Sequence, residues 1–215
     1  MDELELLKQQ WQNREQELPK LSYDDIYKML LKKSSSIVKW IFYISVAELV
    51  FWTVLSLFVP ESSKKFSDDI GLHNALLVLN IISHLIVITF VFLFYKNYRK
   101  ISTTDSVKNL MKNILRTRKT VKYFVIYNVG ASILMIIGLN IYYYLNQDVI
   151  FEMMVTDYGI SKNISQEKFV RVFFVVQFVF GLIMIGLMLL FYRLLYGTLL
   201  LRLNKNYKEL KKLEL

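Results

Sequence analysis

Cysteine is absent from this chain of 215 residues, and histidine occurs only twice. Without cysteine, the protein has no disulfide scaffold, no thiol redox relay and no cysteine-ligated zinc. The two histidines, His73 and His84, lie too close together near one predicted helix to sandwich a haem iron. Glycine-rich phosphate loops and the serine-hydrolase and zinc-protease motifs are missing as well. These absences disfavour an enzyme, and we expect no metal site and no cofactor.

Proline and glycine are also scarce, with 2 and 7 residues, whereas 54% of the residues are hydrophobic. A soluble domain is usually about 45–50% apolar and richer in loop-forming residues. Long apolar runs separated by short charged stretches are typical of helical membrane proteins, because helices satisfy their own backbone hydrogen bonds in lipid.

Four apolar runs are long enough to cross a bilayer, which needs about 20 helical residues for about 30 Å of hydrocarbon. Proline cannot continue a helix without losing a backbone hydrogen bond, so Pro60 is expected to end the first run. The sequence therefore predicts an all-α integral membrane four-helix bundle. The four predicted spans are 37–59, 72–95, 121–145 and 169–192.

Basic residues between and after the spans predict the orientation. Region 96–122 carries nine Lys and Arg against one Asp, and the tail 193–215 carries six. Regions 60–71 and 146–168 each carry two, with more acids than bases. Lys and Arg are retained on the cytoplasmic side of the membrane, so both termini are expected in the cytoplasm. The net charge of +9 is then mostly a topology signal, and we expect no nucleic-acid partner.

The two halves of the chain resemble each other, which predicts two tandem units of a cytoplasmic amphipathic helix and a transmembrane hairpin. Segment 21–32 aligns with 101–112, and after a three-residue shift 37–46 aligns with 120–129. Ser22 and Ser102 each precede an Asp three residues later, a pattern typical of helix N-caps. The predicted parts are the N-terminal helices 1–36, the first hairpin 37–95, the basic helical loop 96–120, the second hairpin 121–192 and the C-terminal helix 193–215.

Glu48 is the acid inside a predicted span, and it lies near the middle of the first one. A carboxylate there costs several kcal/mol unless it is paired or protonated. His84 lies near the middle of the second span and is the expected partner, and the duplicated hairpin carries Ala131 where the first carries Glu48. Polar side chains expected to complete an intramembrane cluster are Asn80, Ser45, Asn128 and Gln177. The cluster is either a proton-sensitive site or a structural pair that fixes the helix register.

The N-terminal segment places Leu4, Leu7 and Trp11 at helical spacing, a narrow apolar stripe. This stripe either packs on the other cytoplasmic helices or binds a soluble partner protein; the two interpretations are compatible.

The stretches LSYDDIYKMLLKKSSSIVKWIFYIS and YKNYRKISTTDSVKNLMKNILRTRKTVKYFVIYN, with the segment around Trp11, resemble a group of small bacterial four-span membrane proteins. These are often encoded beside extracytoplasmic-function sigma factors, and some carry a carotene-oxygenase label. The resemblance implies a membrane-anchored, anti-sigma-like regulator. The chain lacks the His/Cys zinc motif of many anti-sigma domains and the histidine set that a carotene oxygenase needs.

Three functions follow as hypotheses. The first is a non-enzymatic regulatory or scaffolding protein, whose residues Leu4, Leu7 and Trp11 bind a soluble cytoplasmic protein such as a sigma factor. The second is a small proton-linked transporter or pH sensor that uses Glu48 and His84. The third is a structural subunit of a larger membrane complex.

Overall fold

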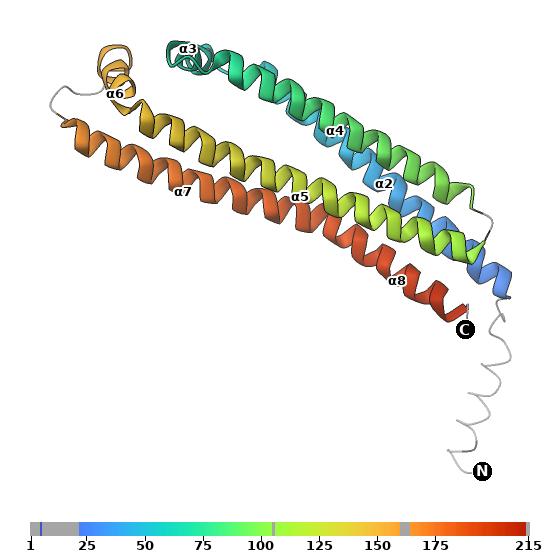
Figure 1. Ribbon diagram of the computed structural model, residues 1–215. Coiled ribbons are helices and arrows are strands. Elements are labelled where there is room, and N and C mark those ends of the chain that lie inside the picture. Colours follow the sequence, from blue (N-terminus) through green and yellow to red (C-terminus); the bar gives the residue numbers. More distant parts are fainter. Residues whose placement is uncertain (1–4, 6–21, 105, 160–163, 214–215) are drawn as a thin grey trace.

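Long helices dominate the computed structural model, which describes residues 5, 22–104, 106–159 and 164–213 (Figure 1). Four of its helical segments are long and apolar enough to cross a membrane. This confirms the prediction of an all-helical chain with four membrane-length helices. The segments are α2 (Tyr23–Leu57), α4 (His73–Ser102), α5 (Val107–Leu145) and α7 (Gln166–Tyr192), the last of which continues through a π-helical segment (Arg193–Gly197) into α8 (Thr198–Leu213).

Serine side chains cap the N-termini of α2 and α5. The Ser22 hydroxyl accepts a hydrogen bond from the Asp25 backbone N–H at 3.2 Å, and the Asp25 carboxylate accepts one from the Ser22 N–H, which is a capping box. Ser106 caps α5 by accepting a hydrogen bond from the Asn109 N–H at 3.3 Å. The expectation that Ser102 starts this helix is wrong, because Ser102 is the last residue of α4.

The connections within the two predicted hairpins, residues 60–71 and 146–168, each contain a short helix. α2 ends at Leu57, as the position of Pro60 predicts, and α3 (Glu61–Asp69) begins directly after that proline. Gly71 then turns the chain into α4 with a φ of +73°, a conformation that costs glycine little because it has no Cβ. α6 (Gln147–Thr156) follows α5.

Three of the four predicted borders fall inside continuous helices, and the fourth, between residues 192 and 193, coincides with the end of α7. α2 runs without a break through residue 37, α4 runs past residue 96, and α5 runs through residue 121. Each long helix therefore begins or ends well outside its apolar stretch, and the basic region 96–120 is the end of α4, a turn and the start of α5.

The long helices form two antiparallel hairpins, α2 with α4 and α5 with α7. At the end of the molecule where α8 lies, α4 contacts α5, and α8 contacts both α2 and α5. Beyond this end the backbones of the two hairpins diverge (Figure 1), and side chains near α3 and α6 join them again.

Three clusters of buried side chains hold these elements together. The base core lies where α2, α4, α5 and α8 meet and contains Leu30, Val38, Ile101, Val107, Leu110, Ile114, Leu203 and Leu210. The aromatic core lies next to it and contains Ile41, Phe94, Val121, Phe124, Tyr192 and Tyr196. The cap core joins the start of α4 to α6 and contains Ile70, Leu72, Ile150 and Met153.

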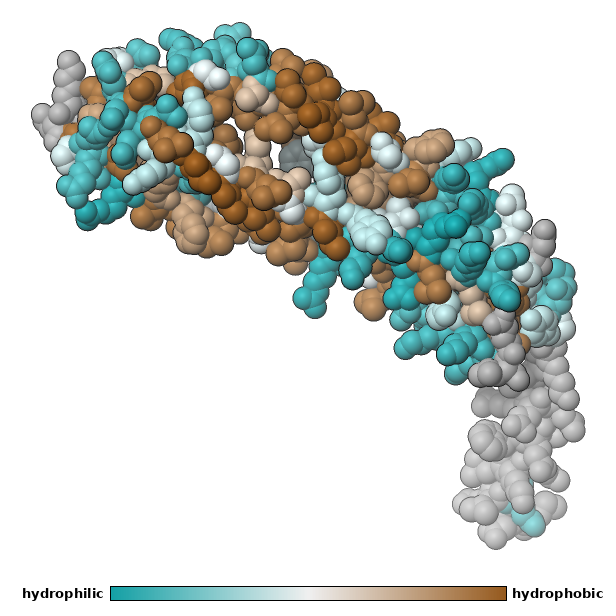
Figure 2. All heavy atoms as spheres, viewed as in Figure 1, coloured by the Kyte–Doolittle hydropathy of each residue, from teal (hydrophilic) through white to brown (hydrophobic). Residues whose placement is uncertain are grey.

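Apolar side chains cover the middle of the molecule, and hydrophilic residues gather at both ends (Figure 2). Leu134 and Phe178 are 71% and 65% exposed, respectively, and many other large apolar side chains on the four long helices are exposed as well. So large an apolar surface is incompatible with water and fits a lipid environment. The chain is therefore a membrane protein with four membrane-length helices.

Candidate intramembrane site

Glu48 belongs to the buried stripe of α2. Ser34, Val38, Ile41 and Ser45 precede it on that stripe, and only 6% of Glu48 is exposed. The stripe follows the spacing of one helix face, which turns inward between the hairpins. Glu48 is therefore held inside the protein and does not face lipid.

Two tyrosines from the other hairpin donate hydrogen bonds to the Glu48 carboxyl. Tyr192 Oη lies 2.6 Å from Oε1, and Tyr196 Oη lies 3.0 Å from Oε2. Both tyrosines are almost fully buried, with exposures of 4% and 1%. Each carboxyl oxygen thus receives one phenol donor, an arrangement that links α2 to α7.

Tyr192 directly precedes the π-helical segment Arg193–Gly197, and Tyr196 lies within that segment. Such widened turns inside helices are frequent at functional sites. The rings of Tyr192 and Tyr196 lie 5.8 Å apart, and that of Phe124 lies 6.1 Å and 5.6 Å from them. These three rings form one aromatic cluster, and its two tyrosines hydrogen-bond to Glu48.

No ion pair involves Glu48 among the residues that the structure describes. An ionised carboxylate has about four lone-pair positions, and the two tyrosines occupy two of them. The group can therefore accept a proton, or act as the counter-ion of a cation that enters from outside the chain.

The predicted contact between Glu48 and His84 is not formed, and this part of the cluster prediction is corrected. The His84 Nδ1 atom lies 2.9 Å from the backbone carbonyl of Asn80, one turn earlier on α4. This contact holds the imidazole against its own helix. The Glu48 carboxyl is instead hydrogen-bonded by the hydroxyl groups of Tyr192 and Tyr196. His84 and the Asn80 side chain instead line a cavity that also reaches Tyr192.

The other predicted cluster residues also bond within their own helices or lie far away. The Ser45 hydroxyl donates to the Phe42 carbonyl at 2.7 Å, and the Asn128 amide donates to the Phe124 carbonyl at 2.8 Å. Gln177 lies about four turns before Tyr192 on α7, about 22 Å along the helix axis, so it does not belong to the site around Glu48.

Two adjoining cavities lie between the hairpins, and they share Trp52, Ser132, Met188 and Tyr192 in their linings. The larger one, about 720 Å³, reaches Glu48 and is otherwise lined mainly by apolar side chains. The smaller one, about 440 Å³, holds more polar groups, with His84, Asn80 and Asn128. In Figure 2 the face of the molecule is hollowed in its apolar middle zone.

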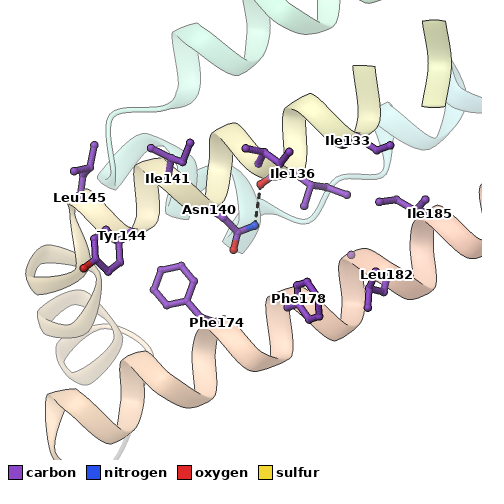
Figure 3. A pocket seen from close by; sticks show the side chains of 12 residues that line it. Ile133, Ile136, Asn140, Ile141, Tyr144, Leu145, Phe174, Phe178, Leu182 and Ile185 are labelled. Atoms are coloured by element: carbon purple, nitrogen blue, oxygen red, sulfur yellow. Dashed lines mark hydrogen bonds between the residues drawn. The ribbon is translucent and has the colours of Figure 1, made fainter. Parts of the chain in front are cut away.

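A third cavity of about 560 Å³ lies between α5 and α7 on the side shown in Figure 3. Its lining is apolar except for Asn140 and Tyr144, and the Asn140 amide donates to the Ile136 carbonyl of its own helix at 2.8 Å. The groove therefore presents no charged group and is less suited to specific recognition than the cavities beside Glu48.

Sequence reasoning missed Tyr192 and Tyr196 as site residues. Tyr192 is the last residue of the fourth predicted span, and Tyr196 lies in the leucine-rich stretch that follows. The available signal was two tyrosines one turn apart that could reach the same lone acid, but nothing local indicates which helix faces α2.

Leu4, Leu7 and Trp11 lie outside the described residues, so the predicted partner-binding stripe has no structural description. Within the part that is described, no group of three or more His, Cys, Asp or Glu could hold a metal ion.

A family model described as a domain of unknown function, DUF8845, matches residues 24–215 of the chain. The chain therefore belongs to this family. No curated protein and no solved structure matches the sequence.

Proposed function

We propose that this member of the DUF8845 family is a non-enzymatic regulatory or scaffolding protein of the bacterial inner membrane that binds a soluble cytoplasmic protein. Its N-terminal segment, with Leu4, Leu7 and Trp11, carries the contact. Both termini lie in the cytoplasm, where the basic region 96–122 and the basic tail also lie. The charge distribution supports this orientation.

The observation that carries this proposal is the base core. All four long helical segments continue past their apolar stretches into one packed end, where Leu110, Ile114, Leu203 and Leu210 are 0% exposed. A chain that only had to span the membrane would not need this additional core. A packed cytoplasmic end gives a partner protein a fixed surface, which lowers the entropy cost of binding.

Polar contacts inside this end fix its register. The Asn206 amide of α8 donates to the Ser34 hydroxyl of α2 at 3.1 Å, and the Asn97 amide of α4 donates to the Thr120 hydroxyl of α5 at 3.0 Å. Buried polar pairs of this kind favour one arrangement of the helices over neighbouring ones. The partner would therefore meet one defined surface.

We also propose that the two halves arose by duplication. Buried positions recur with the same separation in α2 and α5: Ser34 with Thr117, Val38 with Val121, and Ile41 with Phe124. The cap residue Ser22 then corresponds to Ser106 within one residue of this register, which replaces the alignment of segment 21–32 with 101–112. In this register Glu48 still corresponds to Ala131.

The experiment is affinity capture of the full chain from its native membrane in mild detergent, followed by reconstitution with the purified captured protein. We expect a stoichiometric complex whose dissociation constant rises at least about tenfold in Trp11→Ala, because buried tryptophans often dominate interfaces. Gln10→Ala, a polar change beside it, is the control and is expected to bind like wild type. The resemblance makes a sigma factor the first partner to look for.

Unchanged binding in both Trp11→Ala and a triple Leu4, Leu7 and Trp11 alanine variant would show that the segment is not the contact. The absence of any stoichiometric partner would contradict the regulatory function itself.

The buried carboxyl supports a second candidate function, a proton-linked transporter or pH sensor. Glu48 is held by Tyr192 and Tyr196 and borders a cavity of about 720 Å³. If the protein has this function, Glu48→Gln is expected to abolish a pH-dependent activity measured in liposomes, while the variant still folds. A variant that changes only thermal stability would leave Glu48 with a structural role.

A further inference from the structure

The cavity at Glu48 has the size and position of a ligand site. Its volume of about 720 Å³ lies within the about 300–1,000 Å³ typical of small-molecule pockets. It lies between the two hairpins, in the zone where apolar side chains cover the outside of the molecule (Figure 2). A molecule dissolved in the lipid can therefore reach it laterally.

The lining of this cavity favours a ligand that is mainly apolar. Phe51, Trp52 and Phe191 border the cavity together with aliphatic side chains of α7, and the polar share of the lining is small. Trp52 and Phe51 are 51% and 57% exposed, respectively, so their rings lie at the mouth of the cavity. Aromatic faces attract cations as well as hydrocarbon.

Glu48 lines this apolar cavity and can carry a negative charge there when it is ionised. The described residues supply it with two phenol donors but with no cation within ion-pair distance. An anionic ligand would be repelled by the carboxylate, and beside a neutral ligand the carboxyl would stay protonated, because a lone charge is costly in a medium of low dielectric constant. A cationic ligand instead stabilises the ionised carboxylate and gains a counter-ion from it.

We infer that the cavity between the hairpins is a binding site for a hydrophobic organic cation, with Glu48 as its counter-ion and Trp52 as an aromatic wall. In the proposed duplication the second hairpin carries Ala131 at the position that corresponds to Glu48, so it lacks this counter-ion. This inference is independent of the cytoplasmic partner, since neither the base core nor the N-terminal segment takes part in it. It shares Glu48 with the second candidate function but requires no transport.

The test is equilibrium binding of radiolabelled tetraphenylphosphonium to the purified full-length chain in nanodiscs. Wild type is expected to bind about one cation per chain in a saturable manner. The isosteric anion tetraphenylborate has the same shape and similar hydrophobicity, and it is not expected to compete. Competition by tetraphenylborate at the same concentration would overturn the inference and indicate a site that recognises only apolar shape.

Glu48→Gln keeps the shape of the side chain and removes its charge, and it is expected to weaken binding at least about tenfold, the usual effect of removing one member of a buried charge pair. Glu167→Gln is the matched control, since Glu167 is exposed on α7 in a pair with Arg171, and it is expected to bind like wild type. Equal affinity of wild type and Glu48→Gln would overturn the inference.

A second variant keeps the test independent of any folding defect in Glu48→Gln. Trp52→Ala removes an exposed ring at the mouth of the cavity without touching the hydrogen bonds of Glu48, and it is expected to weaken binding severalfold. The size-exclusion profile of each variant must match that of wild type. A well-folded Trp52→Ala variant with full affinity would show that the cation does not lie in this cavity.

Discussion

The hydrogen bond from Tyr192 to Glu48 is expected to stabilise the fold only while both partners are present. The Tyr192 Oη and Glu48 Oε1 atoms lie 2.6 Å apart, at the short end of the range for O–H···O bonds, and both groups are buried. Side-chain hydrogen bonds between membrane helices average about 0.6 kcal/mol and reach about 1.7 kcal/mol. Because the bond is short and buried, we expect a coupling in the upper part of this range, about 1–2 kcal/mol.

A double-mutant cycle measures this coupling. Tyr192→Phe is expected to lower the free energy of unfolding by about 1–2 kcal/mol in the wild-type background. In a Glu48→Leu background the same change is expected to be neutral or stabilising, because the phenol hydroxyl is then itself a buried group without its acceptor. The assay is reversible unfolding of the purified protein in mixed micelles, followed by far-ultraviolet circular dichroism.

Two controls make the result specific. Tyr196→Phe is expected to cost less than Tyr192→Phe, since its bond is longer at 3.0 Å. Tyr95→Phe alters an exposed tyrosine of α4 and is expected to stay within about 0.5 kcal/mol of wild type. An equal cost of Tyr192→Phe in both backgrounds would refute the reasoning, because the carboxyl would then contribute nothing to the stability that the phenol provides.

Three further predictions concern the orientation of the chain, its aromatic core and one turn. Because the chain has no cysteine, single substitutions report topology: Ser63→Cys in α3 is expected to react with a membrane-impermeant maleimide in intact cells, and Lys208→Cys in α8 only after lysis. Phe124→Ala empties the centre of the aromatic core and is expected to lower the free energy of unfolding by about 3–5 kcal/mol, whereas Ile126→Ala on the exposed side of α5 should cost much less. Gly71→Ala is expected to cost about 1–2 kcal/mol because its φ is +73°, whereas Gly186→Ala, with open space around the new Cβ, is expected to be neutral or stabilising.

The membrane-length helices could be predicted because their signal is local. About 20 apolar residues in succession are sufficient evidence for a span, and Pro60 marks an end that the structure confirms. Ser22 was also predictable, since a cap and its Asp lie three residues apart. The second cap was misplaced at Ser102 because Ser102 and Ser106 both fit the local pattern, and only the position of the turn between α4 and α5 distinguishes them.

The partners of Glu48 could not be predicted because they depend on how the hairpins pack. Antiparallel pairing within the first hairpin brings His84 close in depth, and this made it the natural candidate. The rotation of α7 and the π-helical segment decide instead that Tyr192 and Tyr196 face the carboxyl. No periodicity in the sequence reports either feature.

Glu48 lies at the border between two differently packed halves of the molecule. On one side of it the aromatic core and the base core fill the space between the hairpins, and on the other side the hairpins part around the cavities. Its hydrogen bonds cross from α2 to Tyr192, which precedes the π-helical segment, and to Tyr196 within it, and that segment leads directly into α8, which packs in the base core. We therefore expect a change in the charge or occupancy of this carboxyl to act on the helix that connects the apolar zone to the packed end. The same residue would then give the proposed regulator a route from the apolar zone to the surface that we propose to be cytoplasmic.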